Sequence, residues 1–209
     1  MGVLAMVLGP TGSGKSTSLL HFGPNDAEIF GVTGKRLPFR TPLPIRKNAG
    51  YREIYLALKE NRSKVYVVDD STYLMQFDNF KRAQEKGYDK FVTMAVNFET
   101  LLDAAMKTND DTTVYFLHHP QFGEDGGAKP QTIGRMLDNQ LCIEGLCDVI
   151  LECAIVDGEH VFYTNEHGIA KTPLNMFDQQ VVKNDLYMVD ETIRAFWGMA
   201  PLRGERREA

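Results

Sequence analysis

The chain has 209 residues, of which 43% are hydrophobic, and this is enough for one domain with a substantial core. Its formal net charge of −5 excludes a strongly basic nucleic-acid binder, so any nucleic-acid site must be a local basic patch. The sequence has no apolar run long enough to span a bilayer and opens without the basic region of a signal peptide. We therefore expect a cytoplasmic protein with no membrane segment.

The chain opens with a predicted buried strand over residues 2–8, followed by GPTGSGKS and then by a predicted helix that begins with TSLLHF. The stretch GPTGSGKS matches G-x-x-x-x-G-K-[ST], the phosphate-binding loop (P-loop), in the strand–loop–helix context that the motif requires. Backbone N–H groups of such a loop cradle phosphates, the lysine reaches the β- and γ-phosphates, and the hydroxyl binds Mg²⁺. We expect Lys15 to be catalytic and exposed before nucleotide binds. The predicted nucleotide contacts are Gly9, Pro10, Thr11, Gly12, Ser13, Gly14, Lys15, Ser16 and Thr17.

A second strand is predicted over residues 28–33, then a loop rich in proline and basic residues, and then a helix from Tyr51. The run KVYVVDD predicts a third buried strand, which ends in two aspartates. Asp69 stands where P-loop proteins place an aspartate on the Mg²⁺ side, so Ser16 and Asp69 are the predicted metal residues. Asp70 is the candidate catalytic base that orients water, with Glu53 as the alternative.

Helices are predicted over residues 74–86 and 91–105, and the next strand, VYFLHH, ends at His118 and His119. One of the two histidines is a candidate catalytic sensor of the γ-phosphate, because neighbouring residues of a strand face opposite ways. The alternative is a structural histidine. Beyond this strand we expect a mobile glycine-rich segment (121–131), a helix (133–141), a hairpin around Asp157-Gly158 and a short helix (192–197).

This alternation of strands and helices predicts an α/β fold, a mainly parallel sheet with helices on both faces and a C-terminal antiparallel hairpin. Residues 1–200 are expected to form a single domain and residues 201–209 a flexible tail. The three cysteines match no common zinc pattern, and we expect them to be reduced thiols in the core.

No second arginine is evident near the glycine loop, so we expect the γ-phosphate to need a cation from another subunit. This reasoning predicts a homo-oligomer with nucleotide at the subunit boundary. Lys171 follows the predicted hairpin and is assigned to the nucleotide site on this basis. Lys129 and Arg135 are further candidates, and the alternative for all three is an ordinary surface base.

Seven segments together carry a family resemblance: GPTGSGKSTSLLHF, GVTGKRLPF, VYVVDDSTYLM, FKRAQEKGYDKF, VYFLHHPQ, TIGRMLDNQL and AKTPLNMF. From Gly9 to about Asn184 the chain resembles the short phage-encoded AAA-type ATP-binding proteins with a RecA-like core, some of which are single-strand annealing proteins. The resemblance implies a P-loop NTPase with a RecA-like fold, ATP and Mg²⁺ as ligands, and ATP hydrolysis in phage DNA recombination, annealing or replication within an infected bacterium. It carries over Gly9, Gly14, Lys15, Ser16 and Asp69 as nucleotide and metal residues.

Binding of single-stranded DNA would need a local basic patch with aromatic side chains that stack on bases. The candidate footprint comprises Lys81, Arg82, Lys86 and Lys90 with Lys35, Arg36, Arg40, Arg46 and Lys47, and the aromatic residues Phe39, Phe80 and Tyr88. The loop PQFGEDGGAKPQ, which corresponds to a DNA-contacting loop in RecA, is as acidic as it is basic. Two rival functions stay open: a nucleotide or small-molecule kinase, and a nucleotide-switched binding module with little turnover.

Overall fold

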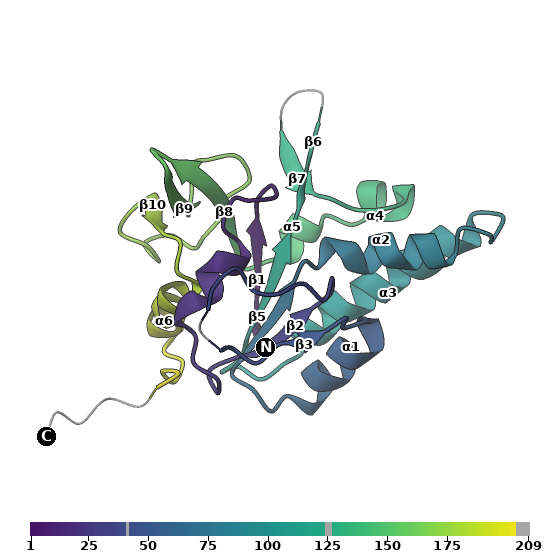
Figure 1. The fold of residues 1–209 in the computed structure, drawn as a ribbon. Helices are drawn as coiled ribbons and strands as arrows, with labels where there is room; N and C mark the ends of the chain where they lie inside the picture. Colours follow the sequence, from purple (N-terminus) through teal and green to yellow (C-terminus); the bar gives the residue numbers. More distant parts are fainter. Residues whose placement is uncertain (41, 124–126, 204–209) are drawn as a thin grey trace, which may run out of the picture.

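Strands and helices alternate along the chain, and the strands assemble into one eight-stranded sheet in the order β10-β9-β8-β1-β5-β4-β2-β3 (Figure 1). The computed structural model of the chain describes residues 1–40, 42–123 and 127–203, without the side chains of residues 135, 138 and 139. The strands of the sheet are β1 (Val3–Leu8), β2 (Glu28–Gly31), β3 (Arg46–Lys47), β4 (Val65–Asp69), β5 (Thr113–His118), β8 (Val149–Val156), β9 (Glu159–Tyr163) and β10 (Val181–Lys183).

The strands from β8 to β3 run parallel, whereas β9 and β10 add an antiparallel edge. The expected hairpin turn is present, since Asp157 and Gly158 have φ angles of 51° and 84°, as a tight β-turn between twisted strands requires. The predicted α/β class, the mainly parallel sheet and the C-terminal hairpin are thus confirmed.

Helices cover both faces of the sheet, as predicted (Figure 1). One face carries α1 (Tyr51–Glu60), α2 (Thr72–Lys81) and α3 (Asp89–Met106), and the other carries α6 (Leu186–Trp197) and the 3₁₀ helix η1 (Ser16–His21). Strand β1 shows why two layers form: Leu4 and Met6 join the core under α3, whereas Ala5 and Val7 join the core under α6. A sheet buried on both faces explains the unbroken apolar runs in the sequence.

Several boundaries differ from the sequence prediction. The helix after the glycine loop is only the six-residue η1, which ends at His21, three residues before Pro24. Helix α2 stops at Lys81, and α6 starts six residues earlier than predicted because the Asp185 side chain caps it by accepting a hydrogen bond from the Met188 N–H (3.3 Å). Two further short helices, α4 (Arg135–Gln140) and α5 (Ile143–Leu146), lie before β8.

The segment expected to be a mobile glycine-rich loop contains a two-stranded ribbon, β6 (Pro120–Phe122) and β7 (Ala128–Pro130), which projects beyond the end of β5 (Figure 1). Residues 124–126 lie outside the described residues. Two residues assigned to the tail contact the domain: Leu202 packs on the core, and the Arg203 guanidinium lies 2.5 Å from the Asp26 carboxylate. The remaining residues assigned to the tail, 204–209, lie outside the described residues.

The strand order brings the candidate site residues to one edge of the sheet. Strand β5 lies between β1 and β4, and β2 lies beside β4. All four strands are parallel, so their carboxyl ends meet at one edge, where a parallel α/β sheet offers its ligand crevice. The glycine loop follows β1, Asp69 ends β4, and His118 ends β5, so one edge gathers segments more than 100 residues apart.

Candidate functional site

The glycine loop closes around the side chain of Lys15. The residue is only 6% exposed, and its Nζ donates hydrogen bonds to the carbonyls of Gly9 (2.5 Å) and Pro10 (3.1 Å). Burial lowers the pKa of Lys15, while the carboxylates of Asp69 and Asp70 act in the opposite direction. The expectation of an exposed lysine is therefore wrong, because the loop's own carbonyls bind the ammonium group before any phosphate does.

A second layer of side chains holds the loop from beneath. The carbonyl of Ser13 accepts hydrogen bonds from the Cys153 thiol (3.2 Å) and from Nδ1 of His160 (2.6 Å). The amide of Asn184 donates to the Cys153 sulfur (3.1 Å). Strands β8 and β9 and the residue after β10 thus fix a peptide of the loop. Burial raises the pKa of the Cys153 thiol, so it is a hydrogen-bonding group here and not a reactive thiolate.

The two predicted metal residues are in contact, since the Ser16 hydroxyl donates to Asp69 Oδ1 (2.9 Å). Burial, together with the neighbouring Asp70, raises the pKa of Asp69 to about 6, against the hydrogen bond from Ser16. A hydroxyl and a carboxylate are the oxygen ligands that Mg²⁺ prefers, usually with phosphate oxygens and water completing the shell. Among the described residues no group of three or more His, Cys, Asp or Glu side chains gathers as a self-contained metal site. The donor set therefore fits a cation that arrives with a phosphate.

Asp70 lies between β4 and α2 with a φ of 61°, in the left-handed region. Its carboxylate accepts a hydrogen bond from the Thr33 hydroxyl (2.7 Å) and lies 3.6 Å from both Lys35 Nζ and His119 Nε2. Burial would raise the pKa of Asp70, but His119, Thr33 and the Lys35 ammonium together hold it at about 2. A carboxylate with so low a pKa orients a water molecule better than it removes its proton.

The two candidate sensor histidines occupy different environments. His118 is fully buried, with Nε2 2.8 Å from the Gln131 carbonyl and Nδ1 2.8 Å from the Ser71 hydroxyl. Burial lowers its pKa to about 4, so its ring is neutral: Nε2–H donates to Gln131, and Nδ1 accepts from Ser71. His119 instead lines the pocket beside Asp70 and packs edge-on against the Tyr73 ring. The geometry thus gives His118 a structural place and leaves His119 as the histidine within reach of a ligand.

A pocket of about 250 Å³ joins these groups at the carboxyl edge of the sheet. The glycine loop, Asp69, Asp70 and His119 line one part, and the turn after β2 contributes the other part with Lys35, Arg36 and Pro38. The expectation that no second arginine lies near the glycine loop is therefore wrong, because Arg36 lines the same pocket. The sequence could have predicted these basic residues at the site, because the turn GKR follows a strand whose carboxyl end lies at the same edge of the parallel sheet.

Other predicted residues lie elsewhere. Lys171 is exposed, pairs with Ile150 in an isolated β-bridge and donates to the Glu144 carbonyl (3.0 Å), outside the pocket lining. Glu53 also lies outside this lining, 3.7 Å from Arg46. Lys129 belongs to β7, and the side chain of Arg135 lies outside the described residues.

The proposed DNA footprint is divided by the fold. Lys35 and Arg36 belong to the pocket, and Arg82 is paired with Asp78 (2.9 Å). Phe39 packs on the core, in contrast to Phe80 and Tyr88, which are 78% and 52% exposed. Phe80 belongs to the last turn of α2, and Tyr88 directly precedes α3.

The three cysteines differ in burial. Cys147 and Cys153 are buried free thiols, as expected, but Cys142 is exposed because it precedes the short helix α5 at the surface. The expectation of three core thiols is therefore wrong for Cys142.

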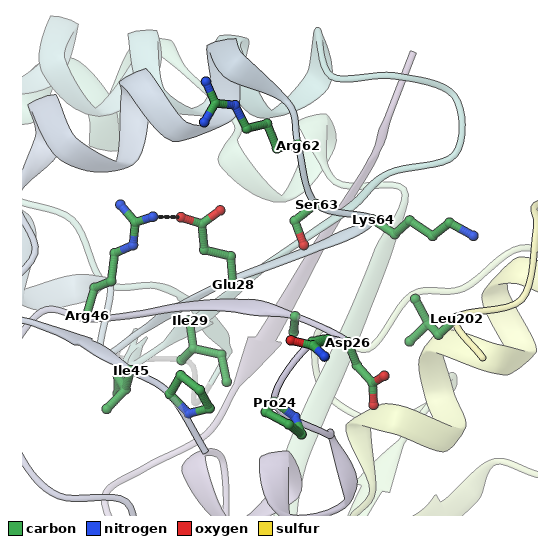
Figure 2. A pocket seen from close by; sticks show the side chains of 13 residues that line it. Pro24, Asp26, Glu28, Ile29, Ile45, Arg46, Arg62, Ser63, Lys64 and Leu202 are labelled. Atoms are coloured by element: carbon green, nitrogen blue, oxygen red, sulfur yellow. Dashed lines mark ion pairs between the residues drawn. The ribbon is translucent and has the colours of Figure 1, made fainter. Parts of the chain in front are cut away.

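A larger hollow of about 590 Å³ lies at the opposite, amino edge of the sheet (Figure 2). Its basic side chains already have acidic partners: Arg46 lies 2.5 Å from Glu28, and Lys64 lies 3.6 Å from Asp111. Figure 2 shows the Arg46 guanidinium facing the Glu28 carboxylate across the hollow. No turn of backbone comparable to the glycine loop borders this hollow in the lining that the structure describes. The smaller pocket is therefore the better candidate for a phosphate ligand.

Within the described part of the chain, no helix combines the length and the apolar character needed to cross a membrane. A scan against protein-family models and a search of curated proteins both found no match to the chain.

Proposed function

We propose that the chain is a P-loop nucleoside triphosphatase with a RecA-like core, which binds ATP with Mg²⁺ in the pocket at the carboxyl edge of the sheet. One observation carries the proposal: the Lys15 ammonium is enclosed by a glycine loop beside the contacting pair Ser16 and Asp69. The sequence motif alone predicts these residue types, and the fold brings the distant aspartate to the loop. Triphosphate binding requires a cationic side chain, side chains that hold Mg²⁺, and backbone N–H groups that can donate to the phosphates.

Each residue has a defined task in this proposal. Backbone N–H groups of the loop hold the phosphates, and Lys15 exchanges the Gly9 and Pro10 carbonyls for the β- and γ-phosphate oxygens. Ser16 and Asp69 would hold Mg²⁺, whose charge would neutralise the phosphates. Asp70 orients the attacking water, and its low pKa makes slow turnover the expected behaviour.

A role in phage DNA recombination, annealing or replication, in the cytoplasm of an infected bacterium, extends the proposal on the strength of the family resemblance. The exposed rings of Phe80 and Tyr88 support it, because aromatic side chains beside lysines are the usual platform for unpaired bases. Because few basic side chains are available, the affinity for single-stranded DNA should be modest. The logarithm of the binding constant should fall by roughly 0.7 per unit of log salt concentration for each neutralised phosphate. Fluorescence anisotropy of a labelled oligonucleotide at several salt concentrations, with and without ATP and Mg²⁺, measures this. Absence of binding at low salt with nucleotide present would refute the DNA role.

A second candidate, a nucleotide or small-molecule kinase, is favoured by Lys35 and Arg36 at the pocket. Cations above the phosphates are what a phosphotransferase needs to stabilise charge on the transferred group. The kinase therefore stays open as the second candidate.

One assay separates the two candidates. Phosphate release and nucleotide products are measured with ATP alone, with ATP and single-stranded DNA, and with ATP and a panel of nucleoside monophosphates. The proposed ATPase releases phosphate in the first two reactions, whereas a kinase converts a monophosphate to a diphosphate. The Lys15→Ala variant is the control for a contaminating enzyme. Failure of the wild-type protein to bind or turn over ATP with Mg²⁺ would refute the P-loop assignment.

A further inference from the structure

Lys35 stands at the mouth of the pocket with a head group that is held but accessible. Its Nζ lies 3.6 Å from Asp70 Oδ2 and 5.4 Å from the centre of the Tyr73 ring. The side chain is nevertheless 68% exposed. An exposed ion pair contributes little to stability, so this lysine can change partner at small cost.

The segment that carries Lys35 is hydrogen-bonded to Asp69 and Asp70. The Val32 N–H donates to the Asp69 carbonyl (3.1 Å), and the Thr33 hydroxyl donates to Asp70 Oδ2 (2.7 Å). The first bond extends the β2–β4 backbone ladder past the end of β2, and the second joins two side chains just beyond it. Lys35 therefore has a fixed attachment point beside Asp69 and a flexible side chain, and both are supplied by the same chain as the glycine loop.

We propose that Lys35 recognises the γ-phosphate and so distinguishes a nucleoside triphosphate from a diphosphate; this inference rests on the proposed function. With a triphosphate bound, the Lys35 ammonium leaves Asp70 for the terminal phosphate. With a diphosphate, it returns to Asp70. Asp70 keeps its hydrogen bond from Thr33 in both states, so the exchange leaves no buried carboxylate without a partner.

The position of the lysine explains why it reads the last phosphate. The glycine loop and Lys15 take the inner phosphates, and the Ser16–Asp69 pair marks the side of the β- and γ-phosphates. Asp70 and Lys35 line the same pocket as the loop and Asp69, and the Lys35 side chain is exposed, whereas Lys15 is buried within the loop. The lysine thus supplies within one chain the cation that the sequence argument assigned to a neighbouring subunit.

The experiment compares binding of ADP and of the non-hydrolysable ATP analogue AMP-PNP, each with Mg²⁺, by isothermal titration calorimetry. The variants are Lys35→Ala, Lys35→Arg and, as a control at an exposed lysine outside the pocket lining, Lys59→Ala in α1. We expect Lys35→Ala to weaken AMP-PNP binding about tenfold with a change of less than about twofold for ADP, because one charged hydrogen-bonding partner is lost. Lys35→Arg should keep most of the preference, and Lys59→Ala should match the wild type.

Equal effects of Lys35→Ala on both nucleotides, or no effect on either, would overturn the inference while leaving the proposed function intact. A wild-type protein that binds neither nucleotide would overturn both. Thermal melting of Lys35→Ala without nucleotide should match the wild type, because the residue is exposed. A lowered melting temperature with parallel loss of both ligands would identify a structural role and reject the sensor.

Discussion

Replacing Gly14 by alanine tests whether the observed form of the glycine loop is the form that binds nucleotide. Gly14 has a φ of 110°, where an L-residue is strained by about 1–3 kcal/mol. A Cβ there would also lie 2.8 Å from His160 Nδ1, which is hydrogen-bonded to the Ser13 carbonyl. Moving that ring sacrifices a bond worth about 1 kcal/mol. The total cost is about 2–4 kcal/mol.

Gly12→Ala is the matched control. Its φ of 83° is also left-handed, but a Cβ there has no atom within 4 Å, so only the backbone strain of about 1–2 kcal/mol applies. The difference between the variants, about 1–2 kcal/mol, corresponds to about five- to thirtyfold in nucleotide affinity if the loop relaxes in the free protein. If the loop stays strained, the same energy appears as lost stability. Titration with AMP-PNP and urea denaturation are therefore measured together.

The double variant Gly14→Ala with His160→Ala separates the two contributions. Removal of the ring should recover the steric part of the loss and leave the backbone strain. Equal behaviour of Gly14→Ala and Gly12→Ala in both measurements would refute the claim that His160 fixes the loop from beneath.

Four other predictions concern the site and its support. Lys15→Ala should abolish nucleotide binding in the same titration and, contrary to the sequence expectation, lower the melting temperature, because this lysine bonds two carbonyls; an unchanged affinity would contradict the assignment. Asp69→Asn should remove the Mg²⁺ dependence of binding, measured with and without EDTA, and an undiminished Mg²⁺ response would contradict it. Arg194→Met should lower the free energy of unfolding in urea by about 3–5 kcal/mol, since it leaves the buried Asp190 carboxylate without the guanidinium 2.6 Å away; a loss below about 1 kcal/mol would count against the pair. The folded pKa of His118 (about 4) lies below its ordinary value of 6.5, so its neutral form stabilises the fold above about pH 6.5 and this contribution falls as the pH drops towards 4; the stability of His118→Gln should change less over that range, and equal slopes would refute the argument.

The sequence predicted those parts of the molecule that depend on short-range pattern. Apolar runs and helical spacing were sufficient for the α/β class, the parallel sheet and the hairpin. The motif GPTGSGKS and the aspartate at the end of β4 were sufficient for the contact of Ser16 with Asp69, because parallel strands deliver their carboxyl ends to one edge.

The burial and direction of individual side chains at the site could not be predicted from such patterns. Alternation along a strand predicts that His118 and His119 face opposite ways. Which of the two is buried depends on the β6–β7 ribbon that follows, because Gln131 after this ribbon bonds His118. The exposure of Lys15 depended on how tightly the loop closes, which no periodicity encodes. Lys35 was grouped with other bases of a proline-rich loop, because a loop has no repeating pattern that gives the direction of its side chains.

The charge arrangement in the pocket also changes the argument for oligomerisation. Three side chains assigned to phosphate or metal already have partners within the chain: Lys15 has two carbonyls, Ser16 has Asp69, and Lys35 has Asp70. These partners hold the side chains near the positions in which a nucleotide would need them, so that binding requires exchange of partners and little movement of backbone. A triphosphate in this pocket would then meet its cations without a second subunit. An oligomer, if it forms, must be explained by contacts other than the missing charge that first suggested it.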